Sequence, residues 1–141
     1  MRLLGIDLGT QSCKVAVYDG ALRIVAEASA PMRTLHPAPG AAEQAPADWL
    51  AAVRAATQAA LAPGVRIDGI GITGQLDGAV ALDRGGAPCG PALIWMDRRA
   101  RVPPLPADFF GRTGQVADAS HLAPRRRGWP RAPRSRACTC R

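Results

Sequence analysis

Two short apolar segments separated by a polar turn open the chain and limit its possible folds more than any other feature. Residues 3–8 and 13–18 are both rich in aliphatic side chains, and the residues between them supply a glycine, two hydroxyl groups and an amide. Apolar runs joined by so short a polar connection predict two antiparallel strands and a tight turn. We therefore expect a β-hairpin here, with Gly9 at its bend.

The turn of this hairpin contains the groups that bind phosphate. Gly9 has no Cβ, so the backbone N–H groups that follow it can approach a bulky anion, together with the hydroxyl groups of Thr10 and Ser12. Asp7 is a candidate Mg²⁺ site through water, because a hard dication prefers carboxylate and water oxygens. The full set of expected phosphate and metal residues is Asp7, Gly9, Thr10, Gln11, Ser12 and Lys14. The alternative is an ordinary hairpin with a solvated turn.

A third strand and a long loop are expected next. Residues 22–30 alternate loosely between apolar and polar side chains and end at Pro31, which predicts a third antiparallel strand and a meander of three. Residues 31–46 are rich in proline and show no periodicity. A loop of this length is usually functional or mobile.

The following region predicts a helix and a strand that returns beside the first one. Apolar residues at helical spacing begin at Ala47 or Asp48, and Pro63 and Gly64 stop the pattern. Residues 65–73 then alternate isoleucine with small partners, as expected of a strand. Strand, helix and strand in this order predict a right-handed crossover to a parallel strand.

Shorter elements follow. Residues 79–82 and 91–95 predict two short strands, and residues 83–86 between them contain the Asp and Gly residues of a hairpin turn. Residues 108–114 predict a helical turn that ends in glycine. The chain is therefore α/β.

Two polar clusters lie at strand ends, where open α/β sheets bind their ligands. Gln75 and Asp77 follow the strand after the helix, and Asp97, Arg98 and Arg99 follow the last short strand. For the first cluster the alternative is a polar turn that caps a strand. For the second it is a helix N-terminus with solvated charges.

Four motifs in order resemble those of one family. D-L-G-T-Q-S-x-K-V at residues 7–15 resembles the first phosphate motif of the actin, hexokinase and Hsp70 ATPase superfamily, and is most similar to that of the FGGY carbohydrate kinases. E-Q-x-P-x-D-W at residues 43–49, G-Q-x-x-G at 74–78 and W-x-D-x-R at 95–99 are also similar to that family. The resemblance implies a ribonuclease H-like half of the actin-like ATPase architecture.

The resemblance also implies a reaction, in which the γ-phosphoryl group of ATP passes, with Mg²⁺, to a hydroxyl of a sugar or polyol. It implies substrate contacts by Gln75, Asp77, Trp95 and Asp97. In the similar glycerol kinases the position of Trp95 is an apolar wall beside the polyol, and a glutamate that accepts hydroxyl bonds occupies the position of Asp77. The xylulokinase subgroup reads Met-His where this chain has Leu76 and Asp77, which argues against xylulose.

The chain departs from the family in what it lacks. The family's general base is an aspartate far downstream, and its adenosine pocket belongs to a second domain, so no catalytic residue is assigned here. We expect an N-terminal portion of a kinase that is inactive alone. The alternative is a non-catalytic binding module with a basic, nucleic-acid-contacting tail.

The basic charge of the chain is confined to residues 125–141. Eleven basic and eleven acidic side chains balance in residues 1–124, and the seven arginines of the tail account for the net charge of +7. We therefore divide the chain into a partial kinase domain, 1–124, and a tail that cannot bury enough apolar surface to order itself. Three interpretations of the tail are a nucleic-acid arm, half of a zinc site at Cys138 and Cys140, and an out-of-frame product of GC-rich coding. The abrupt change of composition favours the last, so no nucleic-acid partner is expected.

The remaining expectations concern location. No apolar leader follows Met1 and no run reaches the roughly 18 apolar residues that a membrane span needs. Four cysteines in a chain of this size do not predict a disulfide scaffold. We expect a cytoplasmic protein with no membrane partner, and the sequence makes no prediction of its oligomeric state.

Overall fold

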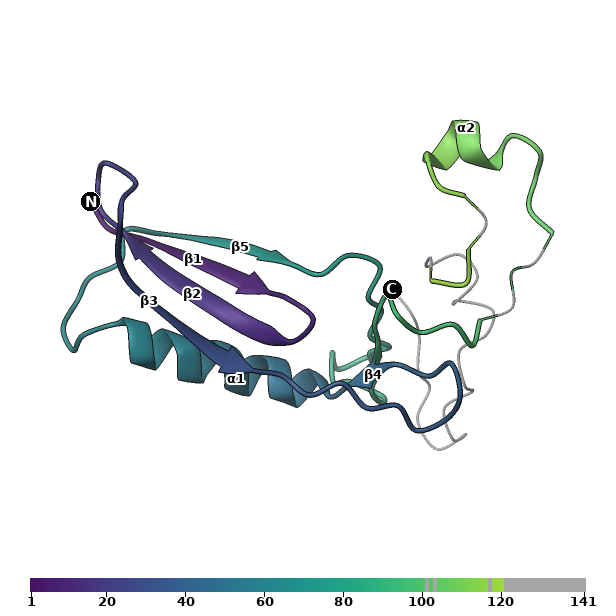
Figure 1. The fold of residues 1–141 in the computed structure, drawn as a ribbon, viewed down its shortest axis with the longest axis horizontal. Coiled ribbons are helices and arrows are strands. Elements are labelled where there is room, and N and C mark those ends of the chain that lie inside the picture. The colour runs from purple at the N-terminus through teal and green to yellow at the C-terminus, as the bar shows by residue number, and fades with distance from the viewer. Residues whose placement is uncertain (101, 103, 117, 121–141) are drawn as a thin grey trace. The chain divides into compact units, whose positions relative to one another are not determined.

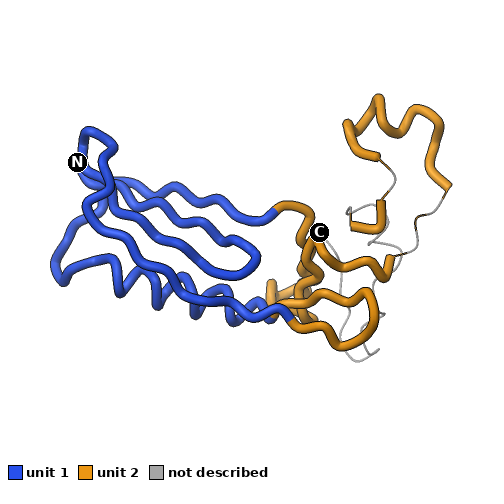
Figure 2. Tube along the Cα trace, viewed as in Figure 1, with its two compact units in different colours: residues 1–34, 45–75 blue, residues 35–44, 76–141 orange. Residues whose placement is uncertain are grey.

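The computed structural model describes residues 1–100, 102, 104–116 and 118–120, so the predicted tail lies outside the described residues. The chain falls into two compact units (Figure 2). Unit 1 contains residues 1–34 and 45–75, and unit 2 contains residues 35–44 and 76–141. Each unit is therefore assembled from segments that are separated in the sequence.

Unit 1 is a four-stranded sheet with a helix on one face (Figure 1). Its strands are β1 (Leu3–Leu8), β2 (Ser12–Tyr18), β3 (Ile24–Pro31) and β5 (Gly69–Gly74), in the order β3-β2-β1-β5. β2 is antiparallel to both β1 and β3, whereas β5 is parallel to β1. The predicted meander, crossover helix and parallel strand are confirmed.

The alternation of side chains along β1 and β2 decides which of them form the core. One set faces α1 (Pro46–Ala60) and is buried, and the other set faces away from the helix. The central side chains of the buried set are Leu4, Ile6, Val15 and Val17 from the strands and Ala52, Ala56 and Ala60 from the helix. Alanine at this spacing lets the helix lie close to the sheet.

Close packing at Ala56 makes a first prediction. Ala56 is 1% exposed, so Ala56→Leu inserts atoms into filled space and should destabilise the protein by about 1–3 kcal/mol. Ala55 is exposed on the same helix, and Ala55→Leu should change stability by no more than about 0.5 kcal/mol. Urea unfolding of the two variants measures the difference. Equal stabilities would show that the helix does not pack closely on the sheet.

Among the boundaries that differ from the predicted ones, the starts of α1 and β5 have a local cause. α1 begins at Pro46, one to two residues before the predicted start, because the fixed φ of proline suits the first helical position. β5 begins at Gly69 rather than at residue 65. The Val65 N–H donates to Ala62 O in a turn after the helix, so the extended segment starts only once the chain has reached β1.

One face of β5 stays uncovered. α1 packs against β2 and β3 and reaches part of β1. Ile70 and Ile72 of β5 are therefore 63% and 70% exposed, although their register partners on β1, Leu4 and Ile6, are buried. Among the strands of the described residues, β5 is also at one edge of the sheet.

Unit 2 has little regular structure among its described residues. β4 (Glu43–Gln44) pairs antiparallel with β6 (Ala92–Leu93), and α2 (Phe109–Thr113) ends at Gly114 in the left-handed conformation, with φ 68°. The predicted helical turn at 108–114 is confirmed. Residues 79–82 form isolated bridges rather than the predicted strand, whereas the hairpin turn after them closes through a bond from Gly86 N–H to Asp83 O.

Candidate functional site

The turn between β1 and β2 is built around Gly9. Its N–H donates to Ser12 O at 3.1 Å, which closes the hairpin directly after the last β1 residue. A Cβ on Gly9 would lie 3.2 Å from that same oxygen, closer than most Cβ contacts. Glycine is therefore favoured here by the tightness of the turn, as the sequence predicted.

The structure brings Gln75 to this turn. Thr10 Oγ1 donates to Gln75 Oε1 at 3.3 Å, and the Gln75 N–H donates to Leu8 O at 2.8 Å. The segment after β5 is thus bonded to the turn after β1, although the sequence separates them by 65 residues. Gln75, expected at the substrate, lies beside Thr10, expected at the phosphate.

The sheet face opposite α1 gathers a second group of polar side chains. Asp7 pairs in register with Lys14 of β2 on one side and with Thr73 of β5 on the other. The three residues line a shallow hollow of about 400 Å³, whose lining also includes the small residues Gly5, Ala16 and Gly71. The open hollow therefore carries two opposite charges and a hydroxyl group among small residues.

Thr73 was missed by the sequence analysis. It belongs to the predicted strand but to no recognised motif, and only the parallel register with β1 places it beside Asp7. One signal in the sequence could have found it. Both strands contain a glycine followed two residues later by a polar residue, Gly5 and Asp7 in one and Gly71 and Thr73 in the other.

The side chains near Asp7 suit a metal ion that is held mainly by water and by the phosphates of a bound substrate. Among the described residues, no group of three or more His, Cys, Asp or Glu side chains could hold a metal ion. Mg²⁺ commonly binds one or two carboxylates and completes its shell with water and substrate phosphates. Asp7 beside a hydroxyl-rich turn fits that pattern, and a closed metal site does not.

Asp77 lies in unit 2 and has an uncommon backbone conformation. Its φ is +54°, in the left-handed region that residues other than glycine seldom adopt, although Asp tolerates it better than most. The side chain is partly buried, and Leu76 before it is 81% exposed. Asp77 therefore has an unusual backbone conformation and a partly buried side chain.

Trp95 borders a hollow of about 500 Å³ in unit 2. The ring is 47% exposed, and the hollow is also lined by Met96, Arg98, Val116, Asp118 and Ser120. Arg98 and Asp118 form an ion pair. The hollow therefore combines an aromatic face with charged and hydroxyl groups, a combination that suits a small polyhydroxy compound.

Asp118 and Ser120 were also missed by the sequence analysis. Hydrogen bonds from the Ser120 side chain and N–H, with the nearby Arg98, lower the pKa of Asp118 to about 2. The spacing Asp-x-Ser, in which Asp118 accepts the Ser120 N–H at 2.7 Å, is a local turn pattern that could have marked the pair.

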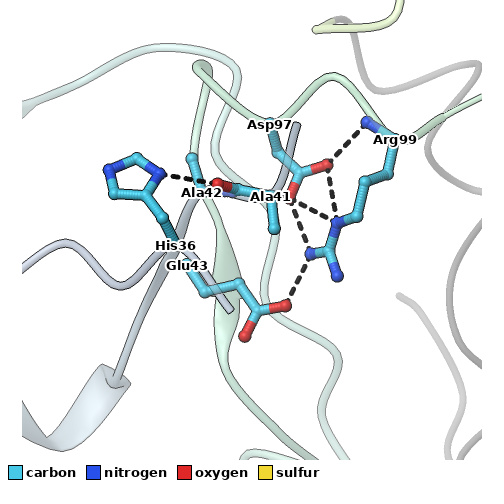
Figure 3. Close-up of polar contacts among 6 residues, drawn as sticks. All are labelled: His36, Ala41, Ala42, Glu43, Asp97 and Arg99. Carbon is cyan, nitrogen blue, oxygen red and sulfur yellow. Dashed lines mark hydrogen bonds and ion pairs between the residues drawn. The ribbon is translucent and has the colours of Figure 1, made fainter. Parts of the chain in front are cut away.

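Asp97, unlike Trp95, is almost completely buried. Its side chain is 1% exposed, and its carboxylate accepts the Ala42 N–H at 3.0 Å and the Arg99 guanidinium at 2.6 Å (Figure 3). Burial alone raises the pKa of this carboxyl, but the bonds from Arg99 and Ala42 outweigh it and hold the pKa below its usual value. His36 Nδ1 donates to Ala41 O at 2.7 Å in the same region.

The lowered pKa of Asp97 predicts a pH dependence. Because the folded carboxyl titrates below the unfolded one, its contribution to stability is complete above about pH 4, the usual Asp pKa, and is lost as the pH falls through the folded value. The stability difference between the parent chain and Asp97→Asn should therefore be constant near neutral pH and shrink below pH 4. Urea unfolding of both chains from pH 7 to pH 2 measures it. A difference that does not change with pH would contradict the assignment.

Comparison with known proteins identifies the class of the fold. The structure of a xyloylose kinase from Brucella ovis aligns with a TM-score of 0.83 and 34% identity, covering 89% of this chain and 28% of that chain. Plasmodium falciparum glycerol kinase with ADP aligns with a TM-score of 0.76 and 26% identity, over 88% of this chain and 27% of that one. The fold is the actin-like ATPase fold found in sugar kinases.

The sequence comparisons place the chain within that class. Residues 2–102 match the N-terminal domain of the FGGY family of carbohydrate kinases. A glycerol kinase from Chelativorans sp. (strain BNC1) is 40% identical over 128 residues, and a xylulose kinase from Staphylococcus epidermidis is 31% identical over 104. The chain belongs to the FGGY family of carbohydrate kinases, as its motifs predicted.

The chain spans about a quarter of the length of its relatives. The matched segment covers 82% of this chain but 26% of the Chelativorans protein, and 71% of this chain but 21% of the Staphylococcus protein. In the part of the chain that the structure describes, no helix is long and apolar enough to cross a membrane.

Proposed function

We propose that this chain is the N-terminal portion of a kinase that transfers the γ-phosphoryl group of ATP to a hydroxyl of a sugar or polyol. The observation that carries the proposal is the bond between Thr10 and Gln75, because it joins the candidate phosphate turn to the segment that leads into the candidate substrate loop. Family membership supports the same reaction.

On the phosphate side, each residue has a distinct role. The hydroxyl groups of Thr10 and Ser12 and the N–H groups after Gly9 donate to phosphate oxygens, and Lys14 adds a positive charge. Asp7 would hold Mg²⁺, and the metal would supply positive charge that neutralises the charge developing on the phosphates. The chain's own contribution is to position these groups on rigid strands.

On the alcohol side, a sugar or polyol offers hydroxyl groups and a C–H face. Trp95 presents an aromatic surface to the C–H face, whereas Asp77, in the same unit, accepts bonds from hydroxyl groups. The named relatives include both glycerol and xylulose kinases, so polyols and ketoses are the substrates to test. The alternative binding module depends on the tail, which lies outside the described residues, and we do not propose it.

A chimera tests the proposal. Residues 1–120 of this chain replace the equivalent segment of the Chelativorans glycerol kinase, which supplies the remaining length. We expect ATP-dependent phosphorylation of at least one compound in a panel of polyols and ketoses. A chimera that is folded by circular dichroism, and still inactive on the whole panel, would refute the proposal. If the chimera does not fold, exchange of residues 3–19 and 69–99 alone repeats the test with fewer new contacts.

The isolated chain should be inactive. Loss of a general base alone lowers a rate by about 10²- to 10⁴-fold, and loss of nucleotide positioning adds to that. The purified 141-residue chain should therefore produce no ADP above background with any panel compound. Steady, substrate-dependent ADP release would contradict the expectation that the general base lies in the part of the relatives that this chain does not match.

Asp77 should determine which alcohol is preferred. Asp77→Ala in the chimera leaves substrate hydroxyl groups without an acceptor, so KM should rise about tenfold for those compounds that use it and less for others. Asp83→Ala, in the hairpin turn of the same unit, is the control. An unchanged ranking of compounds would favour the solvated-turn interpretation of residues 74–78.

A further inference from the structure

A cluster of three charged side chains in unit 2 has no role in the function proposed above. Asp97 binds Arg99 through Nε at 3.0 Å and Nη2 at 2.6 Å, and Arg99 Nη2 also contacts Glu43 Oε1 at 2.5 Å (Figure 3). The side chains of Asp97 and Glu43 are 1% and 14% exposed. The cluster thus joins residues 35–44 to the segment after β6.

Ala42 is where the two segments meet. Its N–H donates to Asp97 Oδ2 at 3.0 Å, and its carbonyl oxygen accepts the Ile94 N–H at 3.2 Å. The Asp97 N–H in turn donates to Ile94 O at 2.9 Å, which makes residues 94–97 a β-turn. A single residue, Ala42, therefore holds both ends of this turn.

Trp95 and Met96 are the two central residues of that turn. Ile94 is 0% exposed and Asp97 1%, whereas Trp95 and Met96 are 47% and 40% exposed. The buried ends are fixed, and the central side chains border the hollow of about 500 Å³. Asp97 and its bonds therefore hold the buried end of the turn that carries Trp95.

The carboxylate of Asp97 is poorly placed to bind a substrate. Its Oδ2 accepts from Ala42 and Arg99, and its Oδ1 accepts the Arg99 N–H at 3.1 Å. A hydroxyl group would have to replace one of these bonds inside a buried site, and the bonds of a buried charge are costly to lose.

We propose that Asp97, Arg99 and Glu43 form a positioning cluster that fixes the Trp95 turn on Ala42, and that Asp97 acts on an alcohol substrate only through Trp95. Asp97 is then a positioning residue rather than a substrate ligand. The second part of this statement rests on the proposed function, whereas the first part does not. The two parts are tested separately.

The first test uses the whole 141-residue chain with Trp49→Phe and Trp129→Phe, so that Trp95 is the remaining tryptophan. Asp97→Asn keeps an acceptor for the Ala42 N–H but removes the negative charge that binds Arg99. Glu43→Gln weakens only the contact between Arg99 and Glu43. Both changes should increase acrylamide quenching of Trp95 and shift its emission to the red. Asp83→Asn is the matched control, because Asp83 also accepts backbone N–H groups, from Gly85 and Ala87, in the same unit.

The outcomes decide whether the cluster of Asp97, Arg99 and Glu43 positions Trp95 or has no effect on it. Unchanged quenching in a folded Asp97→Asn chain overturns the proposal. If that variant does not fold, Glu43→Gln decides, and unchanged quenching there overturns it equally. An increase in Asp83→Asn as large as in Asp97→Asn would also overturn it, because the effect would then be general loosening of the unit.

The second test is a double-mutant cycle in the chimera. Trp95→Ala should raise KM for the alcohol by about tenfold, and Asp97→Asn should raise it by less, with KM for ATP unchanged in both. If Asp97 acts through Trp95, the double variant has the KM of Trp95→Ala. Multiplied effects would identify Asp97 as a direct ligand and overturn the proposal. An inactive chimera would count against the proposed function, while the fluorescence result still decides the positioning cluster.

Discussion

Asp7→Ala in the chimera should lower kcat for every alcohol by about 10²- to 10³-fold, the size expected for the loss of one group that stabilises transition-state charge. Asp7 lies near the end of β1 between Lys14 and Thr73, on the face away from the helix, and we expect its effect to be the same for every alcohol. KM for the alcohol should change little, because the role proposed for Asp7 is on the phosphates.

Glu27→Ala is the matched control for this prediction. Glu27 is an exposed carboxylate on β3 of the same sheet, so its removal changes the net charge equally and should leave kcat within about twofold. Steady-state kinetics over a range of Mg²⁺ concentrations separates the two variants. A selective effect of Asp7→Ala on one alcohol, or no effect on kcat, would remove Asp7 from the phosphate site.

Arg99→Ala should have the largest effect on stability, a loss of about 3 kcal/mol, because it leaves the buried Asp97 carboxylate without its cation. Arg99→Lys restores a charge but not the planar fork, so it should recover only part of that loss. Arg84→Ala, an exposed arginine in the hairpin turn of the same unit, should cost no more than about 0.5 kcal/mol.

Hydrogen exchange locates this effect as well as measuring its size. Exchange of the Ala42 and Ile94 amides should become much faster in Arg99→Ala. The Ala42 N–H donates to Asp97, and the Ile94 N–H donates to the carbonyl oxygen of Ala42. Exchange at Val15, in the core of unit 1, should change little. Equal stability of Arg99→Ala and Arg84→Ala would mean that the ion pair is effectively solvated.

The features that could be predicted from the sequence are local ones. The strands on either side of Gly9 are adjacent in the chain, and the polar turn between them sets their pairing directly. The helix and the strand after it follow from periodicity and from the preference for right-handed crossovers. Family motifs added the order of these elements and the expected reaction.

The features that could not be predicted depend on contacts between distant segments. β4 is two residues long inside a proline-rich loop, so it has no periodicity, and it exists because β6 pairs with it. Glu43 and Arg99 are 56 residues apart, and nothing in either motif says that they meet. Asp97 was predicted to contact the substrate from its place in a family motif, and the motif gave no sign that the fold buries its side chain.

The two edges of the sheet in unit 1 differ in how they resist unwanted pairing. β3 contains an exposed glutamate, ends in a proline and pairs irregularly with β2, and each of these features discourages another strand from joining. β5 reads Gly-Ile-Gly-Ile-Thr-Gly, with no charge, no proline and two exposed isoleucines. β5 therefore lacks the features that discourage another strand from joining, and we expect Ile72→Lys to improve solubility at high protein concentration more than a lysine on β3 would.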